Sequence, residues 1–60
     1  MAIDKAIVAK LEEYIYELCT PSHYVPEWCE LIAYCLGYYG QVTVDMIDAV
    51  RLLKQQGKVK

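Results

Sequence analysis

The chain has 60 residues, of which 57% are hydrophobic and 23% charged. This length suits one small domain over residues 1–60, and the apolar content, above the roughly 45–50% of an average soluble protein, excludes intrinsic disorder. Six basic against eight acidic residues give a net charge of −2. The chain therefore lacks the basic excess that neutralises phosphates, which disfavours nucleic acid as a partner.

A first helix is predicted over about residues 2–19. It ends before Pro21, because proline lacks an amide hydrogen and biases the preceding residue away from helical geometry. Apolar residues recur at helical spacing along one side of this stretch, which indicates a core-facing surface: Ile3, Ile7, Leu11, Tyr14 and Leu18.

A second helix is predicted over about residues 26–39, with Pro26 at its first position, where a missing amide hydrogen is harmless. Apolar side chains cover most of its circumference: Trp28, Leu31, Ile32, Cys35, Leu36, Tyr38 and Tyr39. A helix of this kind is normally buried, so we expect it to be the central helix. Two short amphipathic neighbours would hardly enclose it, and homo-oligomerisation would complete its cover.

A third helix is predicted over about residues 44–56, where Thr43 can cap the start and Gly57 can end it. Leu52 departs from the amphipathic pattern by lying on the polar side. Residues 38–44 contain two aromatics and a Val-Thr-Val run, which also suits a short strand. The expected fold is an all-α domain of three short helices.

The start of the chain has no basic segment before an apolar one, so we expect no signal peptide. The longest uncharged run, residues 31–44, is shorter than the roughly 20 residues that a membrane-spanning helix needs, and we expect no membrane association. The odd count of three cysteines cannot pair completely within one chain, which favours the reducing cytosol.

Zinc-binding residue types are present at Cys19, His23, Cys29 and Cys35, but without the close Cys-x2-Cys spacing of structural sites. Cys29 and Cys35 would lie about 9 Å apart along one helix and about 120° apart around it, which excludes a shared ion or a disulfide. Cys19 and His23 could form a thiol nucleophile and its base, but a proline separates them and no orienting Asp or Asn lies nearby in sequence. No glycine-rich phosphate loop is present. We expect no metal, no cofactor and no catalytic residue, and any role of Cys19, His23 and Cys29 beyond packing stays open.

The aromatic residues are six tyrosines and one tryptophan, with no phenylalanine. A dry core has no reason to favour tyrosine, because each buried hydroxyl needs a hydrogen-bond partner. Tyrosine and tryptophan are enriched at interface hot spots, although amphipathic tyrosines also rim small cores. We expect a partner interface that includes Tyr16, Trp28, Tyr34, Tyr38, Tyr39 and Leu52.

A helix-turn-helix is the alternative. Residues 40–60, from Gly40-Gln-Val-Thr-Val-Asp-Met-Ile to Gly57-Lys-Val-Lys60, resemble a segment of winged-helix domains over about a third of the chain. The resemblance implies a dimeric DNA-binding regulator that would contact nucleic acid through Arg51, Lys54, Lys58 and Lys60. Asp45 and Asp48 depart from it, because they place negative charge where phosphates would approach the helix.

The sequence thus favours a non-enzymatic protein–protein interaction module that acts as a regulator, inhibitor or adaptor of a larger protein. Residues 1–30 hold six acidic residues and two lysines, whereas residues 31–60 hold four basic residues and two aspartates. This asymmetry favours antiparallel pairing of two copies in a homodimer. Small accessory proteins of phages and mobile elements are an analogy for a chain of this size.

Overall fold

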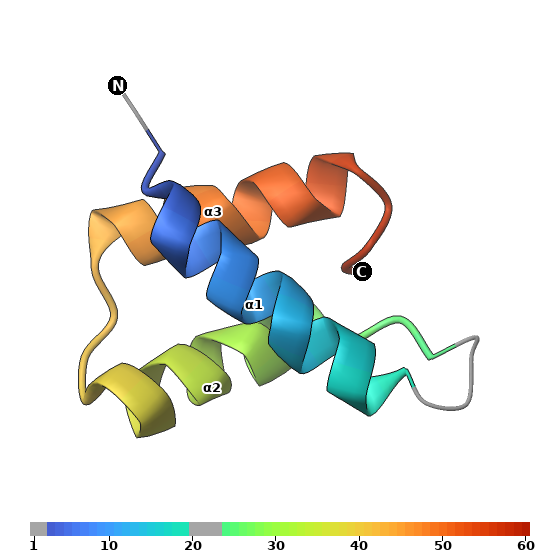
Figure 1. Cartoon of the computed structure of the whole chain (residues 1–60), viewed down its shortest axis with the longest axis horizontal. Coiled ribbons are helices and arrows are strands. Elements are labelled where there is room, and N and C mark those ends of the chain that lie inside the picture. The colour runs from blue at the N-terminus through green and yellow to red at the C-terminus, as the bar shows by residue number, and fades with distance from the viewer. Residues whose placement is uncertain (1–2, 20–23) are drawn as a thin grey trace.

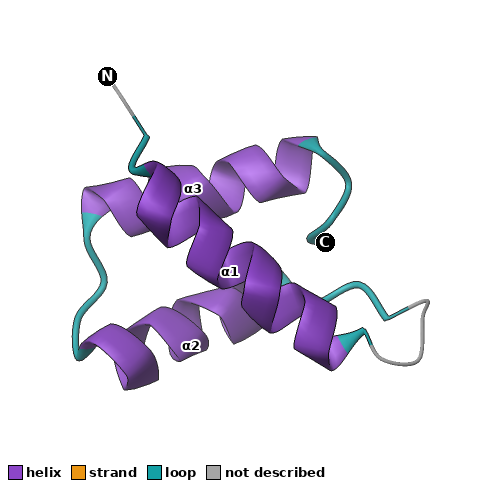
Figure 2. Cartoon of the chain, in the orientation of Figure 1, coloured by secondary structure: helices purple, strands orange, loops and turns teal. Residues whose placement is uncertain are grey.

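The computed structural model describes residues 3–19 and 24–60, and within them the chain forms three helices and no strand (Figure 2). They are α1 (Lys5–Leu18), α2 (Trp28–Tyr39) and α3 (Val44–Gln55). The all-α prediction and the three helices are confirmed. The strand alternative for residues 38–44 is wrong, because α2 continues through Tyr39 and residues 40–43 form the connection to α3. None of the described helices is both long enough and apolar enough to cross a membrane.

Helix α1 begins at Lys5 rather than near residue 2, because Asp4 caps it. The Ala6 amide donates a hydrogen bond of 2.9 Å to Asp4 Oδ1, while Asp4 itself keeps an extended backbone. A carboxylate at this position satisfies an amide that has no partner within the helix and lies at the positive end of the helix dipole.

Helix α2 begins two residues later than predicted, because Pro26 pairs with the C-terminal segment instead of entering the helix. The Lys60 amide donates to the Pro26 carbonyl at 2.9 Å, and the Trp28 amide donates to the Lys60 carbonyl at 3.1 Å. Glu27 between them is extended. These two bonds give partners to polar backbone groups around the start of α2. The helix ends at Gly40, whose φ of 74° is left-handed.

Helix α3 has the ends that the sequence predicts. The Thr43 side chain accepts a 3.3 Å hydrogen bond from the Met46 amide. At the other end Gly57, with a φ of 79°, donates to the Lys54 carbonyl, and the Lys58 amide donates to the Leu53 carbonyl, both at 3.0 Å. This Schellman motif reverses the chain after α3. The reversal returns the C-terminal segment to the domain.

The core draws on all three helices and on the C-terminal segment: Leu11, Ile15, Leu31, Cys35, Met46, Ala49, Val50, Leu53 and Val59. Helices α2 and α3 run antiparallel, and α1 crosses one side of both (Figure 1). The prediction that the second helix is central is wrong, because α3 supplies four of the nine core residues and packs closely on both other helices. Its small Ala49 and Val50 are fully buried and allow that close approach.

Val59 tests the docking of the C-terminal segment, because its side chain is buried between two exposed lysines. We expect Val59→Ala to lower the free energy of unfolding by about 1.5 kcal/mol or more, from lost burial and the cavity left behind. The matched control is Lys60→Ala, which keeps the backbone bonds and truncates an exposed side chain. Equal denaturation midpoints for the two variants would show that the segment adds no stability.

Candidate interaction surface

Three tyrosine rings stack across the junction of α1 and α2. The rings of Tyr14 on α1 and Tyr34 on α2 have centroids 3.9 Å apart and an interplanar angle of 20°. Tyr38, one turn after Tyr34, continues the stack with centroids 5.4 Å apart, and Tyr39 meets Tyr38 edge to face at 4.8 Å. Stacked and edge-to-face pairs stabilise beyond their buried area. The stack thus joins α1 to α2 through side chains.

Lys10 extends this surface with a cation. Its Nζ lies 4.9 Å from the centroid of the Tyr38 ring and 3.9 Å from Glu13 Oε2. Glu13 and then Tyr38 raise the pKa of the Lys10 ammonium above its ordinary value. A cation over an aromatic face is attracted by the ring quadrupole. In the sequence the signal for Lys10 is its four-residue spacing from Tyr14, which places both on one side of α1.

The pKa values of three tyrosines are raised, two by burial and one by a hydrogen bond. Partial burial raises the pKa of Tyr34 and of Tyr39 above the ordinary phenol value. The Tyr24 hydroxyl donates a hydrogen bond to the Glu30 carboxylate, and this bond is the main cause that raises the pKa of Tyr24 to about 12. Because the pKa of Tyr24 is raised, this hydrogen bond stabilises the fold fully below the ordinary phenol pKa of 10.0. The stabilisation is lost as the pH rises towards 12 and the hydroxyl loses its proton.

The predicted interface residues differ in exposure. Tyr16 and Tyr38 are 76% and 57% exposed. Trp28, Tyr34 and Tyr39 are half-buried and pack against the core. Tyr16 does not join the stack, since residues two apart on a helix do not face each other. The structure therefore brings together Tyr34, Tyr38 and Tyr39 and leaves Tyr16 elsewhere on the surface of α1.

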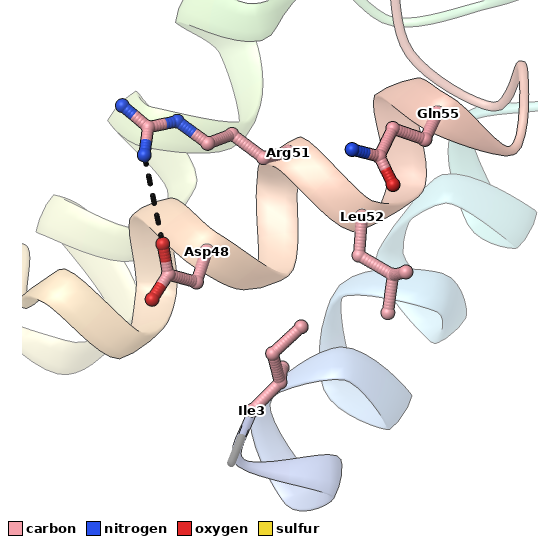
Figure 3. A pocket seen from close by; sticks show the side chains of 5 residues that line it. All are labelled: Ile3, Asp48, Arg51, Leu52 and Gln55. Carbon is pink, nitrogen blue, oxygen red and sulfur yellow. Dashed lines mark ion pairs between the residues drawn. The ribbon is translucent and has the colours of Figure 1, made fainter. Parts of the chain in front are cut away.

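Leu52 lies in a shallow pocket of about 240 Å³ between α3 and the segment before α1. Figure 3 shows its side chain and that of Ile3 pointing toward one another, with Gln55 beside them. At the edge, Arg51 Nη1 lies 3.7 Å from Asp48 Oδ1. Leu52 thus departs from the polar pattern of α3 where it faces Ile3 across this pocket.

A second pocket, of about 290 Å³, lies beside α1 and is lined by Glu12, Ile15, Tyr16, Cys19 and Lys58. The Lys58 ammonium is 2.7 Å from the Glu12 carboxylate, and the Cys19 thiol donates to the Tyr24 carbonyl. Among the described residues every buried side-chain nitrogen or oxygen has a hydrogen-bond partner. No orphaned polar group therefore points to a bound ligand in either pocket.

The three cysteines have separate environments. Cys29 is exposed and Cys35 is buried, on different sides of α2, and Cys19 is half-buried at the end of α1. Burial raises the pKa of the Cys35 thiol. Within residues 3–19 and 24–60 no three histidine, cysteine or acidic residues gather closely enough to hold a metal ion. His23, the base considered for Cys19, lies outside the described residues.

Two of the four cations considered for nucleic-acid contact pair with carboxylates. Arg51 faces Asp48, and Lys58 forms its ion pair with Glu12 across 46 residues of sequence. Lys54 and Lys60 have exposed side chains, on α3 and on the C-terminal segment. The basic set is thus partly neutralised within the chain, which weakens its capacity to attract phosphates.

Comparison with known proteins does not assign a family: no family model, curated protein or solved structure matches the chain.

A double-mutant cycle tests the contact between α1 and α2. We expect Tyr14→Ala and Tyr34→Ala each to destabilise the fold, with a coupling of about 0.5–1.5 kcal/mol between them, because either truncation removes the same ring stack. Chemical denaturation measures the four species of the cycle. The matched variant Tyr34→Phe keeps the ring and should keep the coupling to Tyr14. Additive effects of the two alanine substitutions would contradict an energetic role for the stack.

Proposed function

We propose that the chain is a non-enzymatic protein–protein interaction module that binds a larger protein as its regulator, inhibitor or adaptor. The observation that carries this proposal is the tyrosine stack with its cation, formed by Lys10, Tyr14, Tyr34 and Tyr38. It combines rigid aromatic area with polar hydroxyls and one positive charge at the surface. By size and composition the chain would suit an accessory protein of a phage or mobile element.

Preorganisation makes this surface suitable for a partner. Stacking on Tyr14 restrains Tyr34, and Tyr34 with Lys10 restrains the exposed ring of Tyr38. A restrained ring loses little conformational freedom when a partner covers it, so more of the contact energy contributes to affinity. Tyrosine at the centre of such a contact is a typical hot-spot residue.

The second candidate is a dimeric DNA-binding regulator that uses α2, the connection at residues 40–43 and α3. The exposed Lys54 near the end of α3 favours it. The ion pairs of Arg51 and Lys58 and the acidic first half of α3 weigh against it, because they reduce the positive potential that a DNA reader needs. Protein binding is therefore the better supported function.

Substitution of Tyr38 tests the proposal. A protein captured from a lysate of the source organism, identified and purified, should bind the wild-type chain. Tyr38→Ala should weaken that binding about 30-fold, as expected for a hot spot worth about 2 kcal/mol. Tyr38→Phe, the matched control, should weaken it much less, and the combined Arg51→Gln and Lys54→Gln variant should change it little. Titration calorimetry measures each affinity.

Two results would contradict protein binding through this surface. One is an unchanged affinity in Tyr38→Ala. The other is retention of a defined DNA duplex at physiological salt that falls steeply with added salt and disappears when Arg51 and Lys54 are changed to glutamine.

A further inference from the structure

One broad side of the molecule lacks a covering helix. Helix α1 crosses one side of the antiparallel α2–α3 pair, and no described helix lies over the opposite side (Figures 1 and 2). The fold is therefore two layers, with the second layer packed on its inner side alone.

The outward side of α2 is exposed and uncharged. Cys29, Ala33 and Leu36 follow one another at four- and three-residue spacing, so they form one line along the helix, turned away from the buried Leu31 and Cys35. All three are exposed, and the Leu36 side chain is 58% exposed. Helix α2 is thus apolar on the side that packs in the core and on the side that does not.

Helix α3 extends this surface beside α2. Ile47 and Lys54, seven residues apart, lie on the side of α3 opposite to Leu52, which packs near Ile3 of the segment before α1. Ile47 is half-buried and Lys54 is exposed. We term Cys29, Ala33, Leu36 and Ile47 the outer face, with Lys54 at its edge.

The size of this side matches a protein interface. The whole molecule extends 32 × 23 × 18 Å, and Figure 1 looks down the shortest axis, so each broad side, the uncovered one included, lies along the two longer dimensions. Stable interfaces bury about 800 Å² per partner, close to the area that a side of these dimensions presents. A second copy, which presents a side of the same size, can cover it in one contact.

The charges along the two helices select the orientation. On α2 the acidic residue beside the outer face is Glu30, three residues before Ala33, whereas residues 31–40 are uncharged. Helix α3 is acidic in its first half and basic in its second, with Arg51 and Lys54. Laying α2 antiparallel on α3 of a second copy therefore brings an acidic end to a basic end. The parallel alternative brings acid to acid, and pairing α2 with α2 offers no basic residue to Glu30.

We propose that the outer face binds the outer face of a second copy of the chain, with α2 of one copy antiparallel to α3 of the other. A two-fold axis makes this contact twice, once for each α2. The second copy covers Leu36 and the apolar line beside it. This self-association uses a different surface from the tyrosine stack, so it leaves Tyr38 available to another protein.

Two alanines provide a matched test. Ala33 lies on the outer face and Ala9 on the outward side of α1, and both are exposed helical positions. Sedimentation should find a wild-type dimer, a dimer for Ala9→Glu and a monomer for Ala33→Glu, with equal helical circular dichroism for all three. A wild-type monomer at about 100 µM would overturn the proposal, since association weaker than this lies well below that of stable dimers. A dimer that persists in folded Ala33→Glu would overturn it too.

A charge exchange tests the orientation. Lys54→Glu and Glu30→Lys should each weaken self-association about tenfold, because the repulsion occurs at both ends of a two-fold dimer, and the double variant should recover most of the loss. A double variant weaker than both single variants would overturn the pairing of α2 with α3. Tyr38→Ala should leave the dimer intact, so loss of self-association and loss of partner binding are separate failures.

Discussion

The packing of α3 is the interaction on which the rest of the structure depends. Its buried residues contact both other helices, and the Schellman turn after it returns the C-terminal segment to the start of α2. Val59 then completes the core. The Lys60 amide donates to the Pro26 carbonyl, and the Lys60 carbonyl accepts from the Trp28 amide. Helix α3 and the Schellman turn after it thereby stabilise the fold of a chain that is too short for a large core.

A core centred on α3 leaves α2 with more apolar surface than the domain can bury. Leu31 and Cys35 are fully buried, yet Leu36 on the other side of the same helix is exposed. Exposed apolar surface of this kind marks interaction sites on small proteins. The tyrosine stack and the outer face divide the unburied apolar residues between two surfaces, which gives a physical reason for two kinds of partner.

Local signals predicted the helix ends where one residue decides the geometry. Thr43 and Gly57 were identified because a hydroxyl cap and a left-handed glycine act on their own neighbours. The pairing of Lys60 with Pro26 was beyond such signals, because the partners are far apart in sequence and Val59 stands between two lysines that suggest a solvated tail. The apolar content of α2 led to the wrong prediction of the central helix. It measures how much of a helix surface is apolar, but it does not show which helix carries the small residues that permit close approach.

The tyrosine stack was predictable in part. The spacing of Tyr34 and Tyr38 predicts neighbours on one helix, but their alignment with Tyr14 depends on how α1 and α2 pack.

The central claim is that association completes the burial of α2. The thermal unfolding midpoint measured from about 1 to 100 µM protein tests it most directly, because association stabilises the folded state by mass action. The account predicts that the midpoint rises with protein concentration in the wild type and stays constant in Ala33→Glu. A wild-type midpoint that is the same at every concentration would contradict it.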